Sequence, residues 1–210
     1  MQLVGMLGSP YVRRAAISLR YLDIPFEQTE LSVFRSIDAF SKVNPLLKAP
    51  TLVCDDGEVL MDSTLIIEYA ERLAEESKTL MPEAISDYQS AIRLIGLGLN
   101  ACDKSVQVEY ERKRPNDKQY QPWRDRITSQ LTAAYDLLEP YAEKASAWLV
   151  GEAFSQADLT VCVAWQFTQF IVPDAIDIND YPAISSLSQR AESRPEFMAV
   201  PIEPGWQPKV

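Results

Sequence analysis

The sequence predicts an α+β protein of two domains, a β-α-β-α-β-β-α domain followed by an all-helical domain. Short apolar runs bounded by turn residues alternate with helical periodicity up to about residue 76. From about residue 86 onward, helical periodicity continues without strand signals. Between them, the polar stretch 75–82 ends in proline. We therefore expect domains at 1–76 and 86–210, joined by a linker at 77–85.

The first part of the chain reads as two strand and helix pairs. The run Gln2–Leu7 predicts a buried strand, and a helix follows Pro10, which suits a first helical position. Phe26–Leu31 predicts a second strand. Ser36–Lys42 predicts a short helix that ends before Pro45, because the residue preceding a proline disfavours helix.

A hairpin and a third helix complete the first domain. The runs 51–54 and 58–61 flank Asp55-Asp56-Gly57, where glycine accepts the positive φ of a tight turn. The next helix starts at Asp62-Ser63. In the helical domain, breaks are expected near four prolines, because proline lacks the N–H that a helix interior needs. They are Pro115, Pro140, Pro173 and Pro182, and residues 110–121 are expected to form a mobile loop.

Composition excludes several kinds of chemistry. The 210 residues include no histidine, which excludes Ser-His-Asp and Cys-His catalysis and histidine-ligated metals. A net charge of −10 argues against nucleic acid as a partner. The cysteines Cys54, Cys102 and Cys162 form no CxxC pair, so we expect them reduced and buried, with no metal site.

No segment predicts membrane insertion or export. The first residues lack a basic stretch followed by a long apolar one. The longest uncharged stretch, 159–173, is short for a membrane span and carries two glutamines. We expect a cytoplasmic protein without membrane contact.

The turn Gly8-Ser9-Pro10-Tyr11 is the most informative stretch. It places a hydroxyl where a strand gives way to a helix, and the free amides of a helix start favour an anion. Ser9 and Val12 stand where a Cys-x-x-Cys motif would have sulfur, which excludes thiol–disulfide exchange. Arg13 and Arg14 diverge by about 100° on a helix. At most one is expected to face a ligand, and the other to be solvated or in an interdomain ion pair.

Four short motifs in order carry a family resemblance: Ser9-Pro10, Lys48-Ala49-Pro50, Asp62-Ser63 and Ser155-Gln156-Ala157-Asp158. Over nearly the whole chain, the sequence resembles cytosolic glutathione S-transferases of the bacterial type, with serine at the first turn. The resemblance implies a thioredoxin-like first domain, glutathione as co-substrate without a metal, and a homodimer.

The resemblance also implies glutathione-binding residues in the first domain. A cis Ala49-Pro50 bond would let the backbone of Ala49 pair with glutathione like an added strand. Lys48 would face the glycine carboxylate, with Phe34 nearby. The family more often has valine at position 49. The alternative is a solvated lysine beside an ordinary turn proline.

Asp62 and Ser63 open a helix whose amides and dipole favour a carboxylate, which suits the γ-glutamyl end of glutathione. Asp62 stands where the family commonly has Glu or Gln. The alternative is helix capping alone. Ser155 and Asp158 match a capping box, and we interpret both as structural.

Ser9 is the expected catalytic residue. A hydroxyl that donates to the glutathione sulfur, together with the helix dipole, lowers a thiol pKa by about one to two units. Tyr11 is a rival donor, and Ser9 acting only as a helix cap is the other alternative. Tyr11, Cys102 and Tyr110 are candidates for an acceptor pocket. Asn100, Asp103 and Trp123 are further candidates, whereas Trp165 is expected in the core.

These observations predict a glutathione transferase that conjugates glutathione to a small apolar electrophile. The same scaffold also suits a glutathione-dependent isomerase, dehalogenase or peroxidase. A catalytically silent binding or regulatory protein is the alternative from another class.

Overall fold

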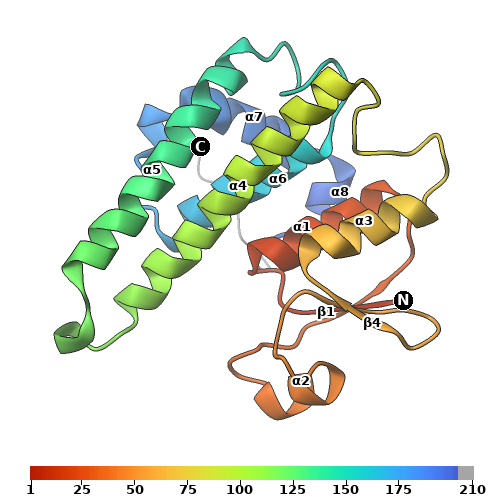
Figure 1. Cartoon of the computed structure of the whole chain (residues 1–210), viewed down its shortest axis with the longest axis horizontal. Coiled ribbons are helices and arrows are strands. Elements are labelled where there is room, and N and C mark those ends of the chain that lie inside the picture. The colour runs from red at the N-terminus through yellow and green to blue at the C-terminus, as the bar shows by residue number, and fades with distance from the viewer. Residues whose placement is uncertain (203–210) are drawn as a thin grey trace. The chain divides into compact units, whose positions relative to one another are not determined.

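The computed structural model describes residues 1–202, which divide into two units (Figure 1). The first unit comprises Met1–Leu80 together with residues 194–202, and the second comprises residues 81–193. The sequence assigns residues 86–210 to the second domain, whereas the structure groups residues 194–202 with the first. The remaining residues of that assignment, 203–210, lie outside the described part of the chain.

A four-stranded mixed sheet with the order β2-β1-β3-β4 forms the centre of the first unit. β1 pairs parallel with β2 and antiparallel with β3, and β3 pairs antiparallel with β4. The strands are β1 Gln2–Val4, β2 Glu27–Thr29, β3 Thr51–Val53 and β4 Val59–Met61. The predicted hairpin is confirmed, with Gly57 at φ 88° in its turn.

Three helices cover the sheet, and they confirm the predicted β-α-β-α-β-β-α order. They are α1 Pro10–Tyr21, α2 Ile37–Val43 and α3 Ser63–Leu73. Figure 1 shows α1 and α3 on one face of the sheet and α2 on the other. Leu3 and Leu52 of the sheet, with Leu19 and Ile66 of these helices, are fully buried in the core.

The end of the described chain packs on α1. α8 Pro195–Met198 buries Phe197, and Val200 and Ile202 beyond it are also buried. Arg13 Nε donates to the Val200 carbonyl at 2.8 Å, and its guanidinium lies 5.6 Å from the centre of the Phe197 ring. These contacts explain why the segment belongs to the first unit.

Helices alone build the second unit. They are α4 Ile85–Arg112, α5 Gln121–Lys144, α6 Gln156–Ile171 and α7 Pro182–Glu192, with single 3₁₀ turns η1 Asn116–Lys118 and η2 Ile178–Asp180. α6 is buried along nearly all its length and packs on α4 and α7. Within residues 1–202, no helix is long and apolar enough to span a membrane.

Three of the four predicted proline breaks are confirmed, and one is wrong. Helices end before Pro115 and Pro173 and begin at Pro182, but Pro140 lies inside α5. The preceding residue, Glu139, is buried and accepts the N–H groups of Ala183 and Ile184 at 2.7 and 3.0 Å. This tertiary contact at the start of α7 fixes the helix where propensity alone would end it.

The capping box at the start of α6 is confirmed. Asp158 accepts hydrogen bonds from the N–H and hydroxyl of Ser155, at 2.9 and 2.8 Å, and from the Leu149 N–H at 2.7 Å. Burial raises the pKa of the Asp158 carboxyl. The box therefore joins the helix start to the loop that precedes it.

The crossing of α4 and α6 depends on a glycine. A Cβ on Gly98 would lie 3.1 Å from Thr160 Cγ2 and 3.3 Å from the Thr160 carbonyl carbon and oxygen. Two residues earlier, Gly96 has open space around the same position.

This difference gives a matched pair of variants in one helix. Gly96→Ala should raise the free energy of unfolding by about 0.5–1 kcal/mol, because alanine favours helix over glycine. Gly98→Ala should lower it by about 1–3 kcal/mol, because the backbone of Thr160 must move. Urea unfolding measures both, and equal stabilisation by the two substitutions would contradict the close helix crossing.

Candidate functional site

Ser9 occupies the turn between β1 and α1, where it is half-buried. Its N–H donates to the Met6 carbonyl at 3.0 Å, and its carbonyl accepts from the Arg13 N–H at 2.9 Å. The side chain makes no capping hydrogen bond, and the hydroxyl has no partner among residues 1–202. The backbone alone therefore fixes Ser9 before Pro10, and the hydroxyl is available to a ligand. Tyr11 is also half-buried, in the first turn of α1.

The Ala49-Pro50 loop lies against this turn. Gly5 has φ 144°, and a Cβ there would come within 2.6 Å of Val12 Cγ2 and 3.3 Å of Ala49 Cβ. The Ala49-Pro50 bond is cis, as the sequence predicts. Neither the N–H nor the carbonyl of Ala49 has a hydrogen-bond partner among the described residues. One backbone amide and one carbonyl thus remain available beside the β1–α1 turn, while Lys48 is exposed.

A buried asparagine that sequence reasoning missed organises this loop. Asn44 Nδ2 donates to Thr51 Oγ1 at 2.9 Å, and Asn44 Oδ1 accepts the Leu46 N–H at 3.0 Å. The Thr51 hydroxyl in turn donates to the Lys48 carbonyl at 2.6 Å. Both ends of the Lys48-Ala49-Pro50 loop are therefore held by side-chain hydrogen bonds. The Asn44-Pro45 pair was its only sequence signal, and it indicated a helix end.

Asp62 and Ser63 open α3. Asp62 has φ 73°, a region in which aspartate is found more often than most residues, and its Oδ1 accepts the Thr64 N–H at 2.9 Å. Ser63 is only 3% exposed, and its hydroxyl oxygen accepts a hydrogen bond from Arg14 Nη1 at 3.0 Å. The same nitrogen donates to Thr64 Oγ1 at 3.1 Å. Asp62 thus caps the helix, and Ser63 joins it to α1.

The two arginines of α1 have separate roles, but neither is solvated. Arg13 and Arg14 are 1% and 2% exposed. Arg13 bonds the segment after α8, as described above, and Arg14 bonds the first turn of α3. The expectation that one of them is solvated is wrong, because Arg13 donates to Val200 and Arg14 to Ser63 within the first unit. An interdomain ion pair for one of them stays a prediction.

Phe34 follows β2 and is 65% exposed. The Ser32 hydroxyl accepts the N–H groups of Phe34 and Arg35 at 3.2 and 3.1 Å and so fixes the turn. Arg35 Nη2 lies 3.3 Å from the sulfur of Met6, which places this exposed cation beside the β1–α1 turn. The loop after β2 is therefore a neighbour of the turn that carries Ser9.

Comparisons with known proteins agree with this arrangement. Residues 3–78 match the model of the glutathione S-transferase N-terminal domain, and residues 102–195 match that of the C-terminal domain. The chain belongs to the glutathione S-transferase family. It is 29% identical over 141 residues to an uncharacterised glutathione S-transferase-like protein of Escherichia coli K12, YibF, covering 67% of this chain and 69% of YibF. It is 28% identical over 198 residues to the maleylacetoacetate isomerase of Dictyostelium discoideum, covering 88% and 85%.

Solved structures of the family are similar over the full chain. A glutathione S-transferase of Methylobacterium radiotolerans, in complex with glutathione sulfonate, has a TM-score of 0.89 at 25% identity and covers 100% of this chain and 98% of its own. A family member of Pseudomonas fluorescens Pf-5 with bound glutathione has a TM-score of 0.82 at 28% identity, covering 100% and 99%.

In the helical unit of this family member, the predicted acceptor residues differ in exposure. Cys102 is buried, whereas Tyr110 is 50% exposed on α4, and partial burial raises the pKa of its hydroxyl. Trp165 packs in the core as predicted, edge-on to Tyr135 at 5.1 Å between ring centres. Tyr11 belongs to the first unit, so a pocket shared by Tyr11, Cys102 and Tyr110 stays a prediction.

The remaining acceptor candidates have structural partners or lie at the surface. Asn100 Nδ2 donates to the Gln130 carbonyl at 3.4 Å, and Asp103 accepts from Gln107 at 2.7 Å. Trp123 is exposed on α5. The cysteines Cys54, Cys102 and Cys162 form no disulfide within residues 1–202 and are buried, as the sequence predicts.

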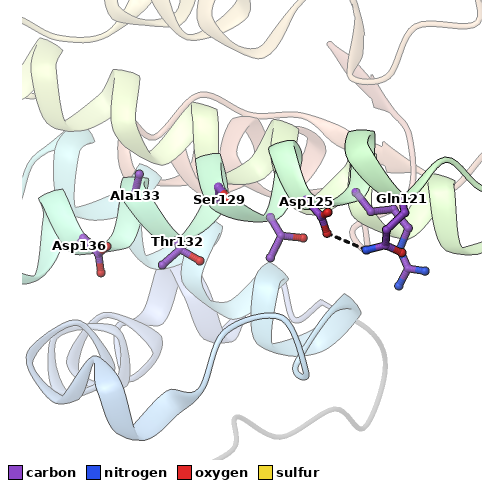
Figure 2. A pocket seen from close by; sticks show the side chains of 8 residues that line it. Gln121, Asp125, Ser129, Thr132, Ala133 and Asp136 are labelled. Atoms are coloured by element: carbon purple, nitrogen blue, oxygen red, sulfur yellow. Dashed lines mark hydrogen bonds between the residues drawn. The ribbon is translucent and has the colours of Figure 1, made fainter.

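A polar cavity of about 450 Å³ follows the surface of α5 (Figure 2). All its lining residues lie on this helix, and none is among the residues predicted for the site. Within this lining, Gln121 Nε2 donates a hydrogen bond to Asp125 Oδ1 at 2.6 Å. The lining is Gln121, Arg124, Asp125, Thr128, Ser129, Thr132, Ala133 and Asp136.

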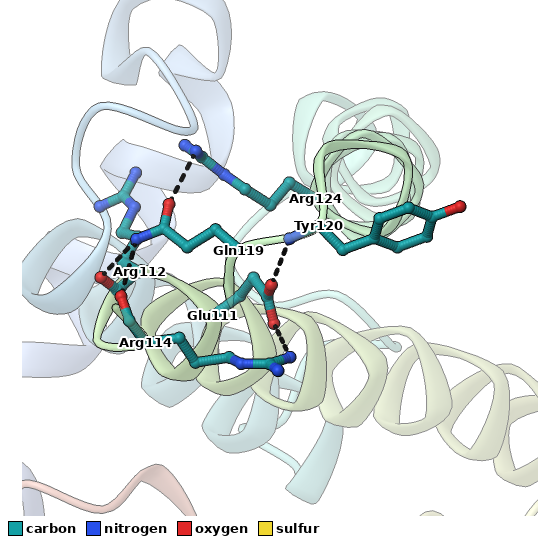
Figure 3. A network of polar contacts seen from close by, with 6 residues as sticks. All are labelled: Glu111, Arg112, Arg114, Gln119, Tyr120 and Arg124. Carbon is teal, nitrogen blue, oxygen red and sulfur yellow. Dashed lines mark hydrogen bonds and ion pairs between the residues drawn. The ribbon is translucent and has the colours of Figure 1, made fainter. Parts of the chain in front are cut away.

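A buried carboxylate that sequence reasoning missed connects α4 to α5 (Figure 3). Glu111 accepts the Tyr120 N–H at 2.8 Å and Arg114 Nη1 at 3.2 Å. Gln119 donates to the Arg112 and Arg114 carbonyls and accepts from Arg124 at 3.2 Å. Residues 110–112 belong to α4, so the expected loop begins later, and this network holds it at both ends.

The Tyr120 N–H, with Arg114, lowers the pKa of Glu111. Because the folded-state pKa lies below the ordinary value, the contact contributes stability above that value and loses it as pH falls through the lowered pKa. The Tyr120 amide resonance should therefore titrate with a midpoint below the ordinary glutamate pKa. NMR across pH 3–7 measures it (a range set by the usual carboxyl pKa). A midpoint at or above that value, or titration that persists in Glu111→Gln, would contradict the contact.

Proposed function

We propose that this chain binds glutathione in its first unit and conjugates it to a small apolar electrophile. The observation that carries the proposal is the Ser9 hydroxyl, half-buried at the start of α1 and without a partner in the described chain. A glutathione thiolate placed there accepts a hydrogen bond from this hydroxyl and faces the positive end of the helix dipole. The similar structures that contain glutathione or glutathione sulfonate support this placement.

The rest of glutathione is proposed to lie along the neighbouring groups. The unpartnered N–H and carbonyl of Ala49 pair with the peptide backbone of the cysteinyl residue as an added strand. Asp62 meets the γ-glutamyl ammonium, and the Ser63 hydroxyl with the first amides of α3 meets the γ-glutamyl carboxylate. Lys48 meets the glycine carboxylate, with Phe34 beside it.

The chemistry needs no further base in this proposal. A cysteine-type thiol is mostly protonated at neutral pH. One charge-assisted hydrogen bond contributes about 1.5–3 kcal/mol, which lowers the thiol pKa by about one to two units. The thiolate then attacks the electrophile, and the sulfur–carbon bond forms as the leaving group departs with its electron pair.

The test measures the pKa of the thiol of bound glutathione from the absorbance of the thiolate as a function of pH. Ser9→Ala should raise this pKa by about one to two units, because the stabilising hydrogen bond is lost. Ser41→Ala, which removes a half-buried hydroxyl from α2, is the matched control and should leave the pKa unchanged. If Tyr11→Phe raises the pKa and Ser9→Ala does not, Tyr11 is the donor.

A glutathione-dependent isomerase is the second candidate, because the Dictyostelium discoideum relative of that name matches 88% of this chain. The two reactions differ in stoichiometry. A transferase consumes one glutathione for each product, whereas an isomerase returns it. Titration of free thiol during turnover of an unsaturated substrate separates them, and bound glutathione without any turnover would favour the silent binding protein.

We also propose a homodimer. Leu65, Tyr69 and Leu73 form an exposed apolar stripe on α3, spaced by four residues. A second stripe on α4 consists of Ile85, Tyr88 and Ile92. Contiguous exposed apolar side chains of this kind mark protein interfaces.

Sedimentation should therefore give twice the chain mass of 23.7 kDa. The double variant Leu65→Glu/Leu73→Glu should sediment as a monomer, because buried unpaired carboxylates disrupt an interface. Leu137→Glu, at a similarly exposed position of α5, is the control and should remain dimeric. A monomeric wild-type chain at micromolar concentration would contradict the proposal.

A further inference from the structure

Arg14 and Ser63 form a hydrogen bond whose direction is fixed by chemistry. A guanidinium has five donors and no acceptor, so Ser63 Oγ must accept from Arg14 Nη1 across the 3.0 Å contact. The proton of the Ser63 hydroxyl is therefore directed to some other group. Thr64 Oγ1 accepts from the same nitrogen at 3.1 Å, so Arg14 holds two side chains of the first turn of α3.

The Ser63 proton has no acceptor among residues 1–202, although the side chain is 97% buried. Buried hydroxyl protons in folded proteins are nearly always donated. The carboxylate of the preceding residue, the exposed Asp62, accepts the Thr64 N–H instead. An acceptor from outside the described chain therefore completes the hydrogen bonding of Ser63.

The charges around the first turn of α3 indicate the charge of that acceptor. The N-terminus of α3 carries the positive end of the helix dipole, and the buried Arg14 cation adds to it. Both favour an anion at the Ser63 hydroxyl. The exposed Asp62 carboxylate one residue earlier favours a cation beside that anion. An anionic group beside a cationic group is what a zwitterionic α-amino acid presents, because its carboxylate and its ammonium are bonded to the same carbon.

We propose that Arg14 is a positioning residue that directs the Ser63 hydroxyl to the α-carboxylate of a free amino-acid end. The inference rests on the proposed function, in which that end is the γ-glutamyl group of glutathione. Arg14 acts through Ser63 and Thr64 and raises the local positive potential from behind them. The site therefore discriminates between ligands that carry this carboxylate and ligands that lack it.

The test compares reduced glutathione with γ-aminobutyryl-cysteinyl-glycine, which lacks only the γ-glutamyl carboxylate. Isothermal titration calorimetry gives the Kd of each for the full chain and for Arg14→Lys. The substitution should weaken glutathione binding by about tenfold and leave the Kd of the analogue within about twofold. Arg13→Lys is the matched control, since Arg13 is equally buried on α1 but bonds Val200, and it should change neither Kd.

A second variant covers the case in which Arg14→Lys does not fold. Thr64→Val removes the Thr64 hydroxyl that accepts from Arg14, at an exposed position and with nearly the same side-chain shape. It should weaken glutathione binding by about threefold, again without effect on the analogue. Equal weakening of both ligands by either variant would overturn the positioning role, and so would an unchanged Kd for glutathione. Failure of the wild-type chain to bind glutathione would instead refute the proposed function.

Discussion

The close approach at Gly5 is the constraint on which the site depends. Gly5, the residue that follows β1, fits between Val12 of α1 and Ala49 of the neighbouring loop only because it has no side chain. This contact places the loop that carries Ala49 beside the β1–α1 turn that carries Ser9. Arg14 of α1 then fixes the start of α3 to the same helix. A single helix thus positions all three parts of the candidate site.

The electrostatics of this site oppose those of the whole chain. The sequence has a net charge of −10, yet the start of α1 and the start of α3 both present positive helix ends, and a buried arginine stands between them. The local positive region attracts small anions, whereas the net negative charge of the whole chain opposes the approach of polyanions. Glutathione has one thiol and two carboxylates, and each has a donor in the proposed arrangement.

Local chemistry made most of the fold predictable. Proline and glycine mark the ends of elements, and apolar spacing separates strands from helices, so the element order and the Ser155-Asp158 capping box could be predicted. Partnerships between distant residues could not. Nothing in the sequence indicates that Arg14 meets Ser63, 49 positions away, or that the buried Glu139 holds the start of α7 and so keeps Pro140 within a helix. Glu111 and Asn44 were missed for the same reason, because their acceptors and donors lie on other elements.

The measurement that tests the central claim most directly is the number of protons released when the wild-type chain binds reduced glutathione. Calorimetric titration in buffers of different ionisation enthalpy counts these protons at each pH. If the site stabilises the thiolate, binding at neutral pH releases about 0.2–0.7 of a proton, because the bound thiol pKa lies about one to two units below the free value. S-methyl glutathione, which has no thiol proton, should bind without this release. Binding of reduced glutathione with no proton release would contradict thiolate stabilisation, and no binding at several millimolar would contradict the site itself.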